Sequence, residues 1–238
     1  MAIIIPMAGL SKRFFDAGYD LPKYMLKINN VSLFNHSVSS FKKYFNSEKF
    51  VFIARNDYGT EAFIENEVNN LGIDDFDIVI LDKVTLGQAD TVIKGLNKIK
   101  LSNEERIIIF NIDTIRKNFE FPSEMKNADG YLEVFNGSGT HWSFVLPGPN
   151  NSVIRTTEKD RISDLCSTGL YYFRNYKLFY NSLNFYKKNQ KLELYIAPMY
   201  NYLISRKFKI LYNKIPKDLV LFSGTPTEFN ILKKNESK

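Results

Sequence analysis

The sequence predicts an α/β fold, built as a Rossmann-like doubly wound mixed sheet. Apolar runs of strand length alternate with helix-like segments through the first half of the chain. The run from Arg106 to Ile112 is almost wholly apolar and ends at Asp113, which is typical of a central parallel strand buried on both faces. From Gly130 onwards the strand candidates are shorter and separated by Gly, Pro and Asn, which favours a smaller, more antiparallel half.

In the first half, strands and helices are expected in strict alternation. Ala2–Pro6 is a short apolar run without charge, which predicts a buried strand, and a loop rich in Gly, Ser, Lys and Arg continues to Lys23. A helix is expected from about Leu33. The later β-rich runs and periodic segments predict strands at 50–54 and 77–81 and helices at 57–71 and 88–98.

The second half carries four short strand candidates followed by helical segments. These strands are predicted at 131–135, 142–145, 153–157 and 169–173. Helices at 176–188 and 192–206, a strand at 208–212 and a helix at 225–232 complete the chain. No linker, internal repeat or low-complexity segment interrupts it. We therefore expect a single domain, 1–238, divided into the halves 1–125 and 126–238.

The composition excludes several classes of function. The formal net charge is +6, but basic residues are scattered among acids without an aromatic-basic signature, so nucleic acid is not an expected partner. Apolar runs fall far below the roughly 18 residues of a membrane span, so no membrane contact is expected. The single Cys166 and the lack of a signal-peptide pattern favour the cytoplasm. With only His36 and His141, any metal is expected to be a hard cation held by oxygen.

The most informative stretch joins the first strand to a glycine turn and two cations. Gly9 lets the backbone approach phosphate oxygens and present its amides to them. Arg13 offers a planar fork, and Pro22 places Lys23 where a point charge can meet negative charge developing at an attacked phosphorus. The alternative is a simple turn with solvated cations. Neither a dinucleotide-binding G-x-G-x-x-G nor a P-loop Gly-Lys-Ser/Thr is present.

These residues resemble the opening signature of the nucleotidyltransferases that activate sugar phosphates and related phosphorylated metabolites. The matching motifs are Ala8-Gly9-x-x-x-Arg13-Phe14 and Pro22-Lys23. The resemblance implies catalytic roles for Lys23, Arg13 and Asp113, and nucleotide contacts from Ala8, Gly9, Leu10, Ser11 and Lys12. Members commonly carry a second glycine where Ser11 stands, which is a departure in this chain.

Two further motifs resemble the nucleotide-binding half of that family, assigned to residues 1–125. Gly87 and Gln88 stand in the segment that reads the nucleobase, with Gly87 allowing close approach; read alone, this segment is only a turn into a helix. Asn111-Ile-Asp113-Thr114 resembles the N-x-D-T motif, in which Asp113 would ligate Mg²⁺. A carboxylate at the carboxyl end of a parallel strand also lies where such sheets bind ligands.

The half 126–238 resembles the acceptor-binding part of the family. Glu158-Lys159 matches a Glu-Lys-Pro motif whose lysine contacts the acceptor phosphate, and Thr168-Gly169 belongs to a strand against which the acceptor lies. Many members hold magnesium with a second aspartate before the final Gly-Thr, where this chain has Phe222. Either another residue, such as Glu193, supplies the second ligand, or the metal depends on Asp113 and the triphosphate.

The resemblance implies transfer of a nucleoside monophosphate from a nucleoside triphosphate to a phosphorylated metabolite or sugar phosphate, with release of pyrophosphate. CTP is preferred because small members of this kind resemble cytidylyltransferases, while UTP and dTTP stay open. The Glu158–Asp164 stretch resembles proteins of bacterial capsule or surface-polysaccharide synthesis. The alternatives are a glycosyltransferase, which would need a D-x-D motif that Asn111-Ile-Asp113 does not provide, and an inactive binding protein, favoured only by Ser11 and Phe222.

Overall fold

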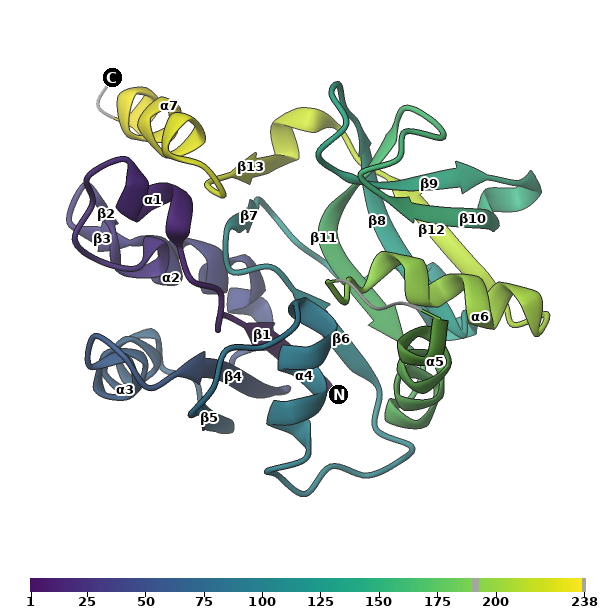
Figure 1. Cartoon of the computed structure of the whole chain (residues 1–238), viewed down its shortest axis with the longest axis horizontal. Helices are drawn as coiled ribbons and strands as arrows, with labels where there is room; N and C mark the ends of the chain where they lie inside the picture. The colour runs from purple at the N-terminus through teal and green to yellow at the C-terminus, as the bar shows by residue number, and fades with distance from the viewer. Residues whose placement is uncertain (190–192, 237–238) are drawn as a thin grey trace.

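A nine-stranded mixed sheet runs through both halves of the chain (Figure 1). The protein is described from a computed structural model, which covers residues 1–189 and 193–236. Strands follow the order β5-β4-β1-β6-β11, after which β11 pairs with both β8 and β9, extended by β12 and β10. The strands of this sheet are β1 (Ala2–Pro6), β4 (Lys49–Arg55), β5 (Phe76–Leu81), β6 (Ile107–Phe110), β8 (Gly130–Asn136), β9 (Ser143–Pro147), β10 (Val153–Glu158), β11 (Leu165–Phe173) and β12 (Ile210–Lys214).

Helices cover both faces of the parallel part of the sheet, which confirms the doubly wound fold. Alternate residues of β1 point to opposite faces, so Ile4 packs into the core formed with α4 and α5, whereas Ile3 packs with α2 and α3. All four residues of β6 are buried because it is covered on both faces. The helices have the bounds α1 (Lys12–Asp16), α2 (Leu33–Val38), α3 (Thr60–Leu71), α4 (Gln88–Leu96), α5 (Tyr176–Asn189), α6 (Tyr200–Ser205) and α7 (Pro226–Glu236).

The central strand is parallel to its neighbour on one side only. β6 pairs in parallel with β1 but antiparallel with β11, so the strand predicted as parallel is parallel to β1 alone, within the mixed sheet that was expected. β11 also begins at Leu165, earlier than predicted, and its register with β8 shifts between Ser167 and Tyr171. Gly169 lies inside this shift with φ +90°, a conformation that favours glycine. β8 pairs along one edge of β11, and β6 and β9 share the other edge.

Two expected elements differ in extent. The helix predicted at 192–206 is a 3₁₀ turn at Ala197–Met199 followed by α6, because Pro198 lacks the amide that a continuous helix needs; Leu192 lies outside the described residues. The predicted loop before Lys23 contains the short helix α1. The segment that begins at Leu33 is α-helical as far as Val38, and a 3₁₀ helix follows over Ser39–Tyr44.

The C-terminal helix α7 lies beside α1 (Figure 1). Phe229 of α7 contacts Phe14 and Tyr19, with ring centroids 6.2 and 5.7 Å away. The Tyr19 hydroxyl donates to the Asn230 side-chain oxygen at 3.2 Å. Two small sheets complete the region: β2 (Lys27–Ile28) with β3 (Val31–Ser32), and β7 (Thr114–Arg116) with β13 (Val220–Phe222).

In the residues that the structure describes, no helix combines the length and apolarity that crossing a bilayer requires.

Candidate functional site

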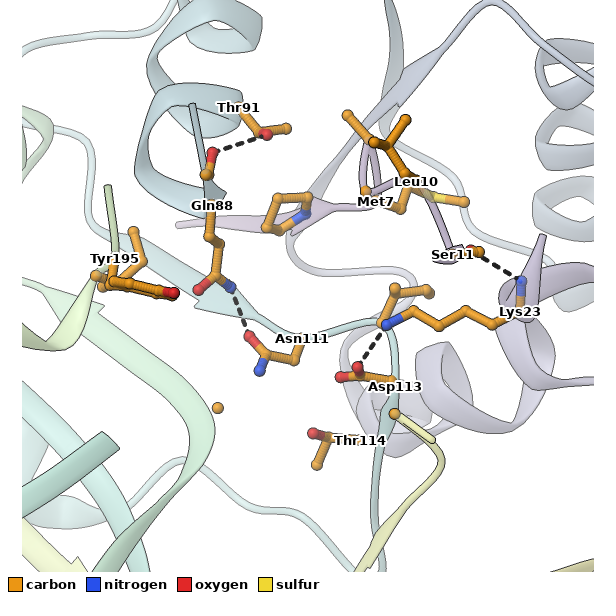
Figure 2. A pocket seen from close by; sticks show the side chains of 18 of the residues that line it. Met7, Leu10, Ser11, Lys23, Gln88, Thr91, Asn111, Asp113, Thr114 and Tyr195 are labelled. Carbon is orange, nitrogen blue, oxygen red and sulfur yellow. Dashed lines mark hydrogen bonds and ion pairs between the residues drawn. The ribbon is translucent and has the colours of Figure 1, made fainter. Parts of the chain in front are cut away.

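A pocket of about 860 Å³ opens where β1 and β6 end and the antiparallel strands begin. Its wall is built from segments far apart in the sequence (Figure 2). Of the site residues predicted from sequence, Lys159 alone is not part of this wall; the others that line it are Ala8, Gly9, Leu10, Ser11, Lys12, Arg13, Lys23, Gly87, Gln88, Asp113, Glu158, Thr168 and Gly169.

The loop after β1 presents its backbone openly to the pocket. A Cβ added to Gly9 would meet no atom of the protein within 4 Å, so the fold itself does not need a glycine here. The space beside Gly9 is open for a ligand to approach the backbone closely. Arg13 lies exposed on α1 and also lines the pocket. The loop therefore offers amides and a guanidinium to one volume.

Ser11 adopts the left-handed conformation, with φ +49°. This conformation explains why a glycine suits the position in related sequences. The Ser11 hydroxyl accepts a hydrogen bond from the Lys23 backbone amide at 3.1 Å, a contact that glycine cannot make. Both ends of the predicted phosphate loop are thereby fastened together (Figure 2).

Lys23 and Asp113 meet across the pocket. The Lys23 Nζ lies 2.5 Å from Asp113 Oδ2, and both side chains are about one-quarter exposed, at 22% and 24%. The Asp113 carbonyl accepts bonds from the Ser223 amide at 2.8 Å and from the Ser223 hydroxyl at 3.1 Å. Asp113 is thus held by the C-terminal segment while its carboxylate faces the phosphate loop (Figure 2).

Gln88, the first residue of α4, points into the pocket and donates through Nε2 to Asn111 Oδ1 at 2.5 Å. Gly87 has φ +124°, and a Cβ there would come within 2.7 Å of the Leu194 backbone. The close approach that Gly87 permits inside the protein is therefore to the chain itself. The Leu194 amide donates to the Leu86 carbonyl at 2.6 Å. The Gln88 segment is consequently locked to the segment after α5.

Asp90 also fixes the segment that contains Gln88, a role that was not predicted from the sequence. Its carboxylate is buried and accepts from the Leu86 amide at 2.9 Å, from Lys94 at 2.7 Å and from Lys187 at 3.4 Å. Burial acts to raise the pKa of Asp90, but the Leu86 amide and the two lysines outweigh it and lower the pKa. Asp90 therefore stays ionised and fixes the loop.

The acceptor side of the pocket contains a half-buried carboxyl group. Burial raises the pKa of Glu158, and the hydrogen bond from the Ser143 hydroxyl and the charge of Lys159 offset this only in part. Ser143 also shares a hydrogen bond of 3.2 Å with the Tyr171 hydroxyl. Glu158 therefore presents a positioned acceptor for hydroxyl or amine hydrogens of a ligand.

Lys159 lies beside the pocket instead of in its wall. Its backbone has φ +56°, which turns the chain at the end of β10. The half-exposed Lys159 ammonium lies 4.7 Å from the centre of the Tyr195 ring and donates to the Tyr195 hydroxyl. That hydroxyl in turn donates to Glu193. The Lys159 ammonium therefore contacts Tyr195 in this arrangement, and its expected contact with an acceptor phosphate stays a prediction.

Phe222 packs into an aromatic group. Its ring centroid lies 5.1 Å from that of Phe135 and 4.7 Å from that of Trp142, with the Lys217 ammonium 5.1 Å away. Burial lowers the pKa of Lys217, partly offset by Cys166 and Glu228. Across residues 1–189 and 193–236, no group of three acidic, histidine or cysteine side chains is placed to hold a metal.

Asn111 is a second residue whose role sequence reasoning missed. Its backbone amide donates to the Gly169 carbonyl at 3.1 Å. Its side chain lies against Gly169, and its side-chain oxygen accepts a hydrogen bond from Gln88. Asn111 thus joins the two sides of the pocket. Its place two residues before Asp113, at the end of a buried strand, was the available signal.

Gly169→Ala is expected to lower stability and to disturb this junction. The new Cβ would lie 2.5 Å from Asn111 Nδ2 in a backbone conformation that side chains rarely adopt, so a loss on the order of 1–3 kcal/mol in unfolding free energy is expected in denaturant titrations. Gly72→Ala is the matched control, because Gly72 has φ +71° with nothing within 4 Å. Equal losses in the two variants would contradict the steric explanation.

Comparison with known proteins agrees with this geometry. No family model matches the chain, and no curated protein sequence does so. Among solved structures, the chain is similar to a nucleoside-diphosphate-sugar pyrophosphorylase from Vibrio cholerae RC9, with 45% identity and a TM-score of 0.93 over 98% of this chain and 99% of the other.

Two more distant structures share the fold. A putative glucose-1-phosphate thymidylyltransferase from Bacillus anthracis is 18% identical, with a TM-score of 0.79 over 98% of this chain and 94% of the other. The inositol-1-phosphate CTP transferase from T. maritima is 19% identical, with a TM-score of 0.75 over 100% and 94%. The identity of the first match over nearly the whole of both chains shows the family: the chain belongs to the sugar-phosphate nucleotidyltransferase family that includes the nucleoside-diphosphate-sugar pyrophosphorylases.

Proposed function

We propose that this nucleotidyltransferase catalyses attack by an acceptor phosphate on the α-phosphorus of a nucleoside triphosphate, forming a nucleotide-activated product and releasing pyrophosphate. The observation that carries the proposal is the meeting of Lys23 and Asp113 at 2.5 Å beside the open Gly9 loop. In this proposal the phosphates lie beside this cation and this carboxylate.

Phosphoryl-type transfer needs positioning and charge stabilisation more than a protein nucleophile. In this proposal the amides near Gly9 and the Arg13 guanidinium hold the outer phosphates, while Lys23 stabilises charge at the α-phosphate. Release of pyrophosphate breaks the bond between the α-phosphorus and its bridging oxygen as the acceptor oxygen bonds to that phosphorus. Atoms balance without a covalent enzyme intermediate.

Mg²⁺ is the expected cofactor, and the residues present fit it. A carboxylate oxygen of Asp113 would be one ligand of the cation. The Lys23 ammonium lies beside this oxygen, so a positive charge is stabilised at this position. When bound with nucleotide, the cation would neutralise charge on the phosphate oxygens. Asp113 is held ready for this role by the two bonds from Ser223 to its carbonyl.

For the substrates, we propose CTP and a sugar phosphate or related phosphorylated metabolite. The Gln88 amide can donate and accept, as base recognition requires, and Asn111 orients it at 2.5 Å. Glu158, Thr168 and Gly169 line the acceptor side, where Glu158 can accept hydrogen bonds from hydroxyl groups. A product for capsule or surface-polysaccharide synthesis, made in the cytoplasm, completes the proposal.

A glycosyltransferase explains the site less well. A nucleotide-diphospho-sugar carries fewer phosphate charges than a triphosphate, yet the pocket gathers Arg13, Lys12 and Lys23. The membership of the family and the absence of a D-x-D motif at Asp113 both favour nucleotidyl transfer. The hydrogen bond from Lys23 to Ser11 also removes one reason to regard the loop as inactive.

The proposal is tested by screening CTP, UTP, dTTP, ATP and GTP, each with Mg²⁺ and a panel of sugar phosphates and other phosphorylated metabolites, for release of pyrophosphate. One pyrimidine triphosphate, with CTP expected, should raise the melting temperature most, because ligand binding to the folded state stabilises it. Arg13→Ala should reduce that shift and raise KM more than it lowers kcat. Stabilisation by nucleotide sugars alone, indifferent to Arg13, would instead support a glycosyltransferase.

A further inference from the structure

The site lacks the second aspartate of many relatives, yet another carboxylate reaches the same place. Phe222 is turned into the aromatic group with Phe135 and Trp142 and has no oxygen with which to ligate a metal ion. Glu228, six residues later on α7, lines the pocket with Asp113. Both carboxylates lie close to Gly224.

Gly224 leaves a space that both carboxylates border. A Cβ added to Gly224 would lie 2.9 Å from Asp113 Oδ2 and 3.6 Å from Glu228 Oε2. The two oxygens therefore approach one point from different elements, Asp113 from the end of β6 and Glu228 from the first turn of α7. Two carboxylates with room for water and phosphate oxygens match what Mg²⁺ takes in nucleotide sites.

One cation already occupies this neighbourhood. The Lys23 ammonium lies 2.5 Å from Asp113 Oδ2, the oxygen that faces Gly224. An ammonium on this oxygen shows that the position favours positive charge and also blocks it against a second cation, since like charges at a few ångströms repel. Lys23 has no other described ion pair, so it can leave Asp113 for a phosphate when nucleotide arrives.

We propose that Glu228 takes the place of the missing aspartate as the second carboxylate of the metal site, and that Lys23 occupies this site in the nucleotide-free protein. The proposal rests on the proposed function for the identity of the cation. Metal and lysine then compete for Asp113 until a triphosphate draws Lys23 away. Glu193, the other candidate from the sequence, accepts from Tyr195 and lies near Lys159, with no described contact to Asp113.

The Glu228 side chain also caps helix α7, so the experiment must distinguish loss of this cap from loss of metal binding. Its Oε2 accepts from the Thr225 amide at 2.9 Å, while the Thr225 hydroxyl accepts from the Glu228 amide at 3.2 Å. This reciprocal pair is a capping box for α7. Oε2, the oxygen that borders the space at Gly224, is also the oxygen that accepts from Thr225, and its second lone pair would face the cation in this proposal. Thr225→Ala damages the cap and keeps the carboxylate.

The test measures Mn²⁺ binding to the full chain without nucleotide, by electron paramagnetic resonance of free Mn²⁺, since Mn²⁺ takes the same oxygen ligands as Mg²⁺. Lys23→Met should bind Mn²⁺ about tenfold more tightly than the unmodified protein, because the competing charge is gone. In the Lys23→Met background, Glu228→Gln should weaken binding roughly tenfold and Asp113→Asn should weaken it further, whereas Glu193→Gln and Thr225→Ala should change it little.

Several results would overturn the proposal. Equal Mn²⁺ affinity with and without Lys23 would show that the lysine does not occupy the site. A loss in Thr225→Ala matching that in Glu228→Gln would assign the effect to the helix cap, and a loss in Glu193→Gln alone would assign the second carboxylate to Glu193. Because no nucleotide is present, these results are independent of the pyrophosphate screen, so failure here is distinguishable from failure of the proposed function.

Discussion

Asp113→Asn is expected to abolish nucleotidyl transfer while leaving the fold intact. An amide is a much poorer ligand for Mg²⁺ than a carboxylate, and it also loses the ion pair with Lys23. The bonds that fix this residue to Ser223 run through its carbonyl, so the substitution preserves them. Pyrophosphate release should fall to the background rate, with a melting temperature close to that of the unmodified protein.

A chelator provides the independent check on this expectation. Turnover should stop when divalent cations are removed and return when Mg²⁺ is added in excess. Asp16→Asn removes a carboxylate from exposed helix α1 and should retain activity. Full turnover of Asp113→Asn, or of the unmodified protein in excess chelator, would refute the role of a metal at this site.

Lys23→Ala is expected to lower kcat by on the order of 10² or more, because its charge acts mainly in the transition state. The loop should keep its shape, since the contact between Lys23 and Ser11 uses the Lys23 backbone amide. Steady-state kinetics should therefore show a large fall in kcat with a smaller change in KM. Circular dichroism should show an unchanged fold.

Lys27→Ala is a suitable control for loss of charge nearby, because Lys27 is exposed on β2, four residues further along the chain. It should leave kcat within a few-fold of the unmodified value, as expected for a surface charge whose field is screened by salt. Near-normal kcat in purified Lys23→Ala would exclude Lys23 from the chemistry.

Much of the fold could be predicted because it depends on local pattern. The run Ala2–Pro6 carries no charge, so its side chains are expected to be buried in the core. The position of a site at the carboxyl ends of parallel strands follows from the geometry of such sheets. The strand directions around β11 were less accessible, because β6 and β9 share one edge of β11 while β8 pairs with the other edge, with a register shift near Gly169 that no periodicity records.

The residues of the candidate site were predicted from their type, but the contacts among them were not. Lys23 and Asp113 are 90 residues apart in the sequence, and Asp113 and Ser223 are 110 apart. Contacts over such separations depend on tertiary packing, which spacing cannot reveal. Asp90 illustrates this point, since it reads as an ordinary helix residue until Leu86, Lys94 and Lys187 are seen around one carboxylate.

The packing of α7 against α1 has a consequence for how the protein is made. During synthesis, residues 9–14 emerge from the ribosome long before Phe229, which packs against Phe14. The N-terminal part of a chain generally folds while the rest is still being translated. The early sheet can therefore form on the ribosome before Phe229 of α7 is available to pack against Phe14. Until α7 emerges, α1 lacks the aromatic contacts that Phe229 makes with Phe14 and Tyr19.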